Sequence, residues 1–351
     1  MIRVTGLEDQ DRWADIVKGF SRHDIYYLPQ YVKAFRIHGD GEPLLIYYES
    51  ADTRAINVVM KRDISSCAHF KDAIAPGTLF DLSTPYGYGG FLVEGDAGGD
   101  ALGKLDAQYG AWCRENGIVS EFVRFHPVLG NYLGMEPVYE VVLLGNTVAM
   151  DLASPESIYY NINKNKRNRI NKALREGMEV CWGWDPSLLE IFREMYVETM
   201  DRNEAQEYYY FEKSFFDSIL VDLKDSALIF YARKDGLIIS TELVLMCNGQ
   251  MHALFGATKS ESLQLSPSTV ISYKAALWGC ENGFKTYHLG GGVGGRKDSL
   301  YKYKLGLNER SENVFAVGRK VFDEEACGRL LEIRLRNGGT LDPGFFPQYR
   351  A

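Results

Sequence analysis

The sequence predicts an α/β protein with two tandem domains. Three observations support this prediction. The chain has 351 residues, which is long for a single hydrophobic core and sufficient for two domains. The order helix, strand hairpin, helix, strand occurs once in each half of the chain. A long helical pattern in each half also ends at an Asn-Gly pair, at Asn116 and at Asn282, a common stop signal for helices.

The first half alternates between helical and extended patterns. Residues 30–38 have helical spacing, and the Val-, Ile- and Tyr-rich runs 43–50 and 55–63 flank a polar stretch, which predicts a hairpin. Residues 80–96 predict a strand that leads into a loop of aromatic residues and glycines. Helical spacing returns over 101–117, and a strand closed by a proline follows over 118–127.

The second half repeats this order. Residues 211–223 predict a helix, and 227–258 predict three strands joined by turns at an Asp-Gly and an Asn-Gly pair. A helix that begins with Ser266 as N-cap and a proline at its first position runs to the second Asn-Gly pair. A strand over 284–291 follows. Sequence identity between the halves is slight, so we infer a structural duplication.

Composition limits the function classes. The formal net charge is −8, so the surface as a whole does not attract nucleic acid, and we expect no DNA partner. The six cysteines show no CxxC or Cys/His ligand spacing, so no metal site is expected. Residues 1–13 contain no apolar signal core, and no apolar run reaches the ~18 residues of a membrane span. We therefore expect a cytoplasmic protein without a transmembrane segment.

A dense basic segment lies between the two halves. A helix start at Ser154-Pro155 leads into residues 164–175, which carry six cations. On a helix that ends at Gly177, residues 166, 169 and 172–173 share one face. In an acidic protein such a patch is either a solvated helix face or a site for an anionic ligand, and the sequence leaves both readings open. The cations are Lys164, Lys166, Arg167, Arg169, Lys172 and Arg175.

Glycine occupies five of the six positions from Gly290 to Gly295. The spacing satisfies G-x-G-x-x-G, but no βαβ unit follows, as a dinucleotide site would need. The P-loop pattern fails because Arg296-Lys297-Asp298 stands in place of Lys-Ser/Thr. Glycines instead allow close approach to the main chain, and free N–H groups in such a turn can bind anions.

A cluster of lysines and tyrosines follows the glycines. If residues 298–306 are extended, Lys302 and Lys304 point to one side, and Tyr301 and Tyr303 point to the other. A lysine held beside a substrate carbonyl could stabilise the oxyanion that develops during acyl transfer. The alternative is that these lysines are surface charges.

Several segments, in their order and spacing, resemble the Fem (FemABX) transferases. "HLGG" followed by a loop and "SLYKYKLGLN" is similar to that family's closing motif of strand, Gly-Gly, loop and Leu-Tyr-x-Phe-Lys-x-Gly-Phe. "NKRNRINKALREGMEV" resembles its basic helix, with Arg-x-x-Ile-x-x-Ala-x-x-x-Gly-Val. "MYVETMDRN" is similar to its Tyr-x-x-Thr-Met-x-Arg segment, and "LSTPYGYGGF" and "FVRFHP" match landmarks of its first domain. The resemblance spans most of the chain.

The resemblance implies a fold and an activity. It implies two GNAT-like domains, residues 1–147 and 148–351, each a mixed and mostly antiparallel sheet flanked by helices, the second with the basic helix and the catalytic loop. It implies an enzyme that moves an aminoacyl group from aminoacyl-tRNA to an amine of a peptidoglycan precursor, in cell-wall synthesis. The acceptor would be a UDP-linked muropeptide or a lipid-linked precursor. No tightly bound cofactor is implied, and relatives use acyl-CoA as donor.

The resemblance also implies roles for particular residues. The family's important lysine falls on Lys304, which would stabilise the transition state, and Tyr303 stands where the family usually has Phe. The basic helix would supply an anion-binding set, Lys166, Arg167 and Arg169. The substrate-binding set would be Lys33, Arg36, Tyr86, Arg202, Gly291, Gly292 and Tyr303.

The chain departs from relatives in two places. It lacks the charged heptad insertion with which some Fem ligases bind tRNA. Residues 257–269 occupy the place where GNAT acetyltransferases carry Gln/Arg-x-x-Gly-x-Gly/Ala for the CoA pyrophosphate, and they have no such glycines. The N–H groups at the start of the following helix could still bind an anion.

We therefore predict direct acyl transfer in a cleft between the domains, with Lys304 and main-chain donors of loop 290–295 stabilising the oxyanion. The general base is left open among Asp298, Glu242 and the substrate. His126, His252 and His288 are expected to be core histidines. Two alternatives remain at this stage. One is an acyl-CoA-dependent N-acyltransferase acting on a sugar or amino-acid amine, and the other is a non-catalytic module that binds an anionic ligand.

Overall fold

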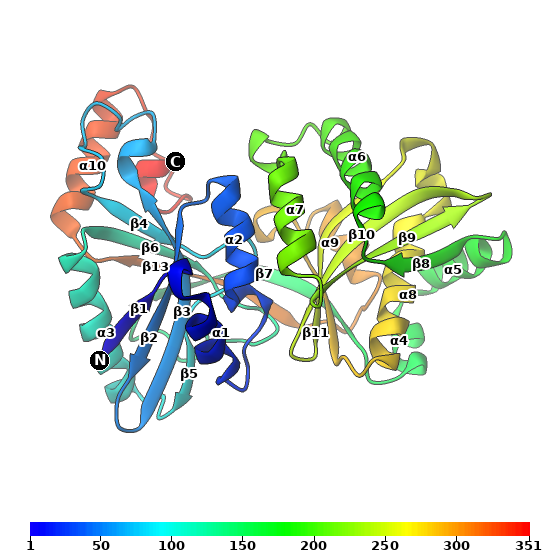
Figure 1. Cartoon of the computed structure of the whole chain (residues 1–351), viewed down its shortest axis with the longest axis horizontal. Helices are drawn as coiled ribbons and strands as arrows, with labels where there is room; N and C mark the ends of the chain where they lie inside the picture. Colours follow the sequence, from blue (N-terminus) through cyan, green and yellow to red (C-terminus); the bar gives the residue numbers. More distant parts are fainter. The chain divides into compact units, whose positions relative to one another are not determined.

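The computed structural model describes residues 1–351, which divide into two compact units. Unit 1 consists of Met1–Leu144 and Phe315–Ala351, and unit 2 consists of Gly145–Val314. Each unit is a mixed sheet with helices packed on it, as the sequence predicted (Figure 1). The predicted second domain, 148–351, differs from unit 2 at its end, because the segment Phe315–Ala351 belongs to unit 1.

Apolar packing explains why the end of the chain belongs to unit 1. Leu330 and Tyr349 are fully buried in a cluster with Ile64 and Phe70. Burying side chains of this size stabilises a fold by roughly 1.5–3 kcal/mol each. Sequence order alone gives no sign of this long-range pairing.

Unit 1 contains one sheet and four α-helices. Its strands are β1 (Ile2–Thr5), β2 (Glu42–Glu49), β3 (Thr53–Asp63), β4 (Phe80–Ser83), β5 (Leu92–Gly95), β6 (Ile118–Arg124) and β13 (Asn313–Val321). Its helices are α1 (Gln10–Lys18), α2 (Pro29–His38), α3 (Gly99–Glu115) and α10 (Glu324–Arg336). The strand order is β1-β2-β3-β4-β6-β13, and β5 pairs with β3. Strands β4 and β6 are parallel, and the other pairs are antiparallel.

Unit 2 begins within β7 (Glu140–Asp151) and contains six α-helices. Its other strands are β8 (Glu179–Gly183), β9 (Ala227–Lys234), β10 (Leu237–Cys247), β11 (Gln250–Thr258) and β12 (Thr286–Gly291). Its helices are α4 (Pro155–Asn161), α5 (Lys164–Arg175), α6 (Pro186–Arg202), α7 (Lys213–Asp222), α8 (Pro267–Glu281) and α9 (Ser299–Leu305). The strand order is β8-β9-β10-β11-β12-β7. Strands β11 and β12 are parallel, and the other pairs are antiparallel.

The two sheets repeat one plan, which confirms the predicted duplication. In each unit four antiparallel strands are followed by a parallel partner and then by one more antiparallel strand. Two helices precede the second of these strands, namely α1 and α2 in unit 1 and α6 and α7 in unit 2. One long helix, α3 or α8, leads into the parallel strand.

The hairpin turns of unit 2 follow from their sequences. Asp235 and Gly236 join β9 to β10, and Asn248 and Gly249 join β10 to β11. All four residues have positive φ, between 46° and 79°. Such turns match the right-handed twist of paired strands, and Asp, Asn and Gly tolerate this backbone conformation. The predicted positions of both turns are confirmed.

Strands β11 and β12 pair over a short distance only. Hydrogen-bonded register joins Gln250–His252 to Thr286–His288. Beyond it, β11 continues to Thr258 and β12 to Gly291 without pairing to each other. Side chains and main-chain groups that a continuous ladder would use are therefore free to line a cavity at this end of unit 2.

None of the chain's helices has the length and apolar character to cross a membrane.

Candidate active site

A cavity of about 420 Å³ lies in unit 2 where β11 and β12 stop pairing. Residues 253–258 of β11 form one wall, and residues of β10, β12, α6, α8 and α9 complete it. The lining combines apolar residues with polar side chains that could orient a small molecule. The polar and charged lining residues are Thr199, Arg202, Asn203, Thr241, Glu242, Thr258, Ser268, Ser272, Tyr303 and Lys304.

Lys304 reaches this cavity from a helix, so the extended conformation considered for 298–306 does not occur. The Asp298 side chain caps α9 by accepting a hydrogen bond from Tyr301 N at 2.8 Å. This cap favours the helix because it satisfies one of the free N–H groups of the first turn. On the helix Lys302 is exposed, whereas Lys304 is half-buried and lines the cavity. The two lysines therefore do not share one side.

The environment of Lys304 disfavours its charge. Burial lowers the pKa of Lys304 to about 8, although the negative charges of Glu242 and Asp298 act in the opposite direction. Its Nζ donates one hydrogen bond, to the Gly291 carbonyl at 3.0 Å. The ammonium has further protons to donate, and it lines a cavity. A desolvated cation of this kind can stabilise a negative oxygen more strongly than it could in water.

The glycine loop supports Lys304, and some of its N–H groups are used within the loop. Gly290 has φ +81°, and a Cβ there would stand 3.1 Å from the Lys304 Nζ. A Cβ at Gly292 would stand 2.1 Å from the Arg296 carbonyl oxygen. The N–H of Val293 donates to Asp298 at 2.9 Å, and the N–H of Arg296 donates to the Val293 carbonyl. These two N–H groups bind within the loop, and the loop brings the Gly291 carbonyl to the lysine. Oxyanion donors from the main chain of residues 290–295 stay a prediction.

Glu242 is the carboxylate of this cavity. It lies on β10, and burial raises its pKa to about 7 against the lowering influence of the Tyr287 and Ser272 hydroxyls and of Lys304. The Ser272 hydroxyl lies 3.4 Å from Glu242 Oε2. A carboxylate that titrates near neutral pH is suited to accept a proton.

Asp298, the other carboxylate considered as a base, has a different environment. Hydrogen bonds from the Tyr301 and Val293 N–H groups lower its pKa. It caps α9 and fixes the glycine loop, and it does not line the cavity. Between the two protein carboxylates, the geometry thus favours Glu242.

Tyr303 joins the cavity to the basic helix. Its hydroxyl lies 3.1 Å from Ser268 Oγ and 3.2 Å from Thr269 Oγ1, both in the first turn of α8. The Lys166 Nζ of α5 stands 3.5 Å from the centre of the Tyr303 ring, a cation–π contact. Burial and the charge of Arg169 lower the pKa of Lys166 to about 8. An anion bound beside Lys166 would relieve both effects.

The predicted anion-binding set divides in the structure. Lys166 contacts Tyr303, and the Arg169 guanidinium lies 3.4 Å from Ser266 Oγ at the N-cap of α8. Arg167 instead donates to the carbonyls of Tyr160 and Ile162, at 3.1 and 2.9 Å, where α4 ends. Two of the three residues thus lie near the start of α8, and the third stabilises a helix end.

Arg202, which was predicted to bind substrate, lines the same cavity from the last turn of α6. Its guanidinium donates to the Thr258 carbonyl at 2.8 Å and to Ser260 Oγ at 3.1 Å. These bonds tie α6 to the end of β11 and hold that wall of the cavity. A role for Arg202 in binding substrate stays a prediction.

The remaining predicted substrate residues lie in unit 1. Arg36 pairs with Glu42 at 2.8 Å, and both side chains are about half exposed. The Tyr86 carbonyl accepts a hydrogen bond from the Tyr31 hydroxyl at 2.7 Å, and its ring stacks on Phe35 with centroids 5.4 Å apart. Lys33, half-buried on α2, belongs to the same part of unit 1. Their role in substrate binding also stays a prediction.

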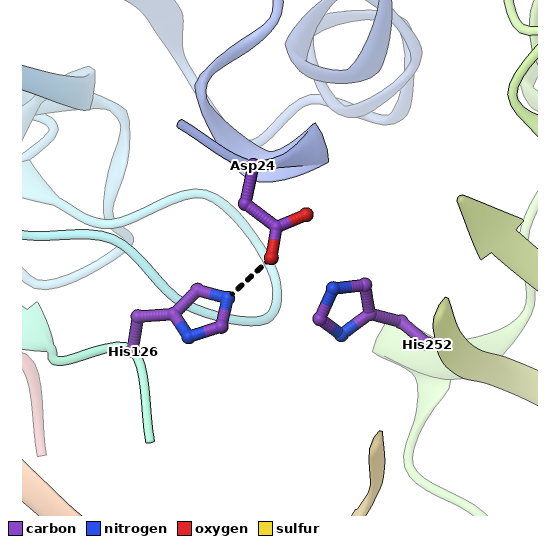
Figure 2. A group of neighbouring side chains, drawn as sticks. All are labelled: Asp24, His126 and His252. Carbon is purple, nitrogen blue, oxygen red and sulfur yellow. Dashed lines mark hydrogen bonds and ion pairs between the residues drawn. The ribbon is translucent and has the colours of Figure 1, made fainter. Parts of the chain in front are cut away.

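The three histidines are buried, as expected of core residues. In unit 1, His126 Nε2 lies 2.8 Å from the buried Asp24 carboxylate (Figure 2). His126 Nδ1 accepts a hydrogen bond from Leu129 N. In unit 2, His288 bonds the Thr147 hydroxyl at 2.9 Å. The His252 ring lies 5.8 Å from the His288 ring. Neither His252 nor His288 lines the cavity that contains Lys304.

Sequence reasoning missed several polar residues of the cavity, among them Ser272 and Thr199. Ser272 follows Ser268 by four residues and so lies on the same face of α8, a spacing that helical periodicity could have revealed. Thr199 hydrogen-bonds the N–H of Thr258 at 3.3 Å. That contact joins α6 to β11 and has no local sequence signal.

Residues 161–305 match the family model described as an acetyltransferase (GNAT) domain. The match contains the basic helix, Glu242, Lys304 and all of the cavity lining except Leu307. No curated protein matches the sequence. The match covers less than half of the chain and supports an acyltransferase with a GNAT-type domain.

Solved structures share the whole fold. FemX has a TM-score of 0.66 at 14% sequence identity, over 94% of this chain and 99% of that chain. The C-terminal DUF2156 domain assigned to a lysylphosphatidylglycerol synthetase of Agrobacterium fabrum has a TM-score of 0.56 at 13% identity, over 95% and 99%. A conserved protein of unknown function from Bacteroides thetaiotaomicron has a TM-score of 0.57 at 13% identity, over 91% and 99%. The chain thus has the FemX fold, which confirms the resemblance seen in the sequence.

Proposed function

We propose that the protein transfers an aminoacyl group from aminoacyl-tRNA to an amine of a cell-wall peptidoglycan precursor. The observation that carries this proposal is the presence of a half-buried lysine and a half-buried carboxylate, Lys304 and Glu242, in one cavity of the GNAT domain. The aminoacyl donor and the cell-wall acceptor are suggested by the Fem-like motifs, the FemX fold and the second neighbour, whose assigned name describes a lysyl-lipid product.

The cavity can perform the transfer with these two groups. The acceptor amine attacks the carbonyl carbon of the aminoacyl ester, and the carbonyl oxygen takes up the negative charge. Lys304 donates a hydrogen bond to that oxygen, while Glu242 accepts the proton that the amine loses. Collapse of the intermediate breaks the ester bond, and the protonated Glu242 returns the proton to the departing ribose oxygen. Atoms and protons balance, and the cycle leaves both side chains as they began.

The start of α8 supports a phosphate-bearing donor. Ser266 caps the helix without a side-chain hydrogen bond, and Lys166 and Arg169 stand beside this helix end. Helix N-termini and cations together favour phosphate groups. Both tRNA and CoA carry such groups, so this feature is common to the two candidate donors.

A second candidate is an acyl-CoA-dependent N-acyltransferase that acts on a sugar or amino-acid amine. The acetyltransferase domain match favours this candidate. The loop between β11 and α8 argues against it, because residues 257–269 lack the glycines that bind the CoA pyrophosphate in GNAT acetyltransferases.

A transfer assay with two donors separates these candidates. The protein is incubated with a UDP-linked muropeptide and with either a mixture of radiolabelled aminoacyl-tRNAs or acetyl-CoA. We expect the label to move from aminoacyl-tRNA to the muropeptide amine, and Lys304→Met to abolish the transfer. Transfer from acetyl-CoA alone would replace the proposal with the second candidate. Absence of transfer from either donor to a panel of amine acceptors would contradict both.

A further inference from the structure

One face of the unit 1 sheet is polar where a buried sheet face is usually apolar. Alternate residues of a strand point to opposite faces. In β6, Val123 lies in the apolar core with α3, whereas Phe122 and Arg124 point to the other face. Register places Arg319 of β13 opposite Phe122, and Ser83 of β4 beside it. This second face lines a cavity of about 240 Å³.

Four arginines line this cavity, and no carboxylate does. They are Arg62, Arg124, Arg319 and Arg350. The rest of the lining is Ser83, Phe122, Leu144, Val317 and the segment Gly344–Pro347. Cations gathered so closely repel one another unless anions compensate them.

Three of the arginines have partners within unit 1. The buried Asp81 carboxylate accepts from Arg62 Nε at 2.7 Å and also pairs with Arg350. Arg350 donates a further bond to the Asp63 carbonyl, at 3.4 Å. Arg124 donates to the carbonyls of residues 84, 85 and 87, in the loop after β4. Asp81 thus compensates one of the four positive charges.

Arg319 is the exception. Its Nε is buried and has no hydrogen-bond partner within the protein. Its guanidinium stands 5.9 Å from the centre of the Phe346 ring. Leaving a charged donor without a partner costs more free energy than leaving a neutral one, so this position is unfavourable to the isolated chain. An oxyanion that accepts from Arg319 would remove the penalty and compensate the excess charge.

We propose that this cavity, lined by Arg62, Arg124, Arg319 and Arg350, binds a phosphate group of a ligand. Guanidinium groups bind phosphate through two parallel hydrogen bonds. The rings of Phe122 and Phe346, whose centroids are 6.5 Å apart, offer an apolar contact to the group that carries the phosphate. The site belongs to unit 1 alone and shares no residue with the cavity of Lys304.

Pyrophosphate is the probe for this site. Isothermal titration is carried out on the full chain carrying Lys166→Gln, so that phosphate binding near α8 does not obscure the signal, with sodium chloride matching the ionic strength. Arg319→Gln and Arg319→Lys are compared with Arg12→Gln. Arg12 is an exposed arginine on α1, so its variant makes the same charge change away from the cavity. Hydrogen exchange of residues 344–350 is followed in parallel.

We expect Arg319→Gln to weaken pyrophosphate binding at least about tenfold, because it removes a charge-assisted pair of bonds. Arg319→Lys should have an intermediate effect, and Arg12→Gln should have none. Pyrophosphate should protect residues 344–350 from exchange, and Arg319→Gln should abolish that protection.

Three results would overturn the proposal. They are the absence of pyrophosphate binding, equal affinity in the Arg319→Gln and Arg12→Gln proteins, and protection confined to unit 2. Malonate, which carries two carboxylates, is titrated as a comparison. If malonate bound as tightly as pyrophosphate, the assignment to phosphate would be wrong. If Arg319→Gln did not fold, the Arg319→Lys protein would decide the question. Wild-type affinity for pyrophosphate in the Arg319→Lys protein would show that the guanidinium has no role in binding.

Discussion

Replacement of Lys304 by methionine should abolish activity and stabilise the fold. The two side chains have similar length, and methionine removes the charge from a half-buried position. Burial lowers the pKa of Lys304 from its ordinary 10.5 to about 8. At 1.36 kcal/mol per pH unit, holding the charged lysine at neutral pH costs the fold about 3 kcal/mol. Loss of the bond to Gly291 returns roughly 1 kcal/mol of this, so we expect a net gain of about 2 kcal/mol.

The sign of the pH dependence follows from the direction of the pKa change. Because the folded state binds its proton less tightly than the unfolded state, the wild-type protein should gain stability as the pH rises from about 8 to about 10.5. The Lys304→Met protein should lack this gain.

Melting temperature and transfer rate are measured together to test this prediction. Removing an oxyanion donor typically slows catalysis about 100- to 1000-fold, and we expect a loss of at least that size. Lys302→Met is the matched control, since Lys302 is exposed on the same helix, and it should change neither quantity. A Lys304→Met protein with near-normal turnover would refute the catalytic role. One that melts well below the wild type would refute the argument from burial.

Three further predictions concern other residues. The pH profile of the transfer rate should be bell-shaped, because Glu242 is ionised only above about pH 7 and Lys304 is protonated only below about pH 8. In the Glu242→Gln protein the rate should fall, and the acidic limb of the pH profile should vanish. Glu121 is fully buried among Asn57, Tyr109 and Tyr139, and burial raises its pKa from 4.5 to about 7. Wild-type stability should therefore decline as the pH rises from about 4.5 to 7, by roughly 3 kcal/mol. Glu121→Gln should flatten that slope in pH-dependent melting, while Asn57 Oδ1, which has no partner now, accepts from the new amide. Gly290→Ala should destabilise the protein by roughly 1–2 kcal/mol, because residue 290 has φ +81°. It should also lower kcat, because the new Cβ would press on the Lys304 side chain. An unchanged kcat would argue against the loop as a support for the lysine.

The sequence determined features that depend on neighbouring residues. The Asp-Gly and Asn-Gly turns of unit 2 were predictable because positive φ at both turn positions is tolerated by few residue types. Several helices could be located because apolar spacing and caps act within a few residues, as with Ser154 before α4. The duplicated order of elements followed from these local signals. The Fem-like motifs then pointed to Lys304.

Tertiary structure decided what depends on distant contacts. The tertiary structure places Phe315–Ala351 in unit 1, because Leu330 and Tyr349 pack against apolar residues of that unit. It favoured Glu242 over Asp298 as the proposed base, because a pKa depends on burial and on partners that come from other elements. It also gathered arginines from β3, β6, β13 and the end of the chain around one cavity. Residues so far apart in sequence form no local pattern. Their electrostatic interactions become strong only after folding has brought them together and removed water from around them.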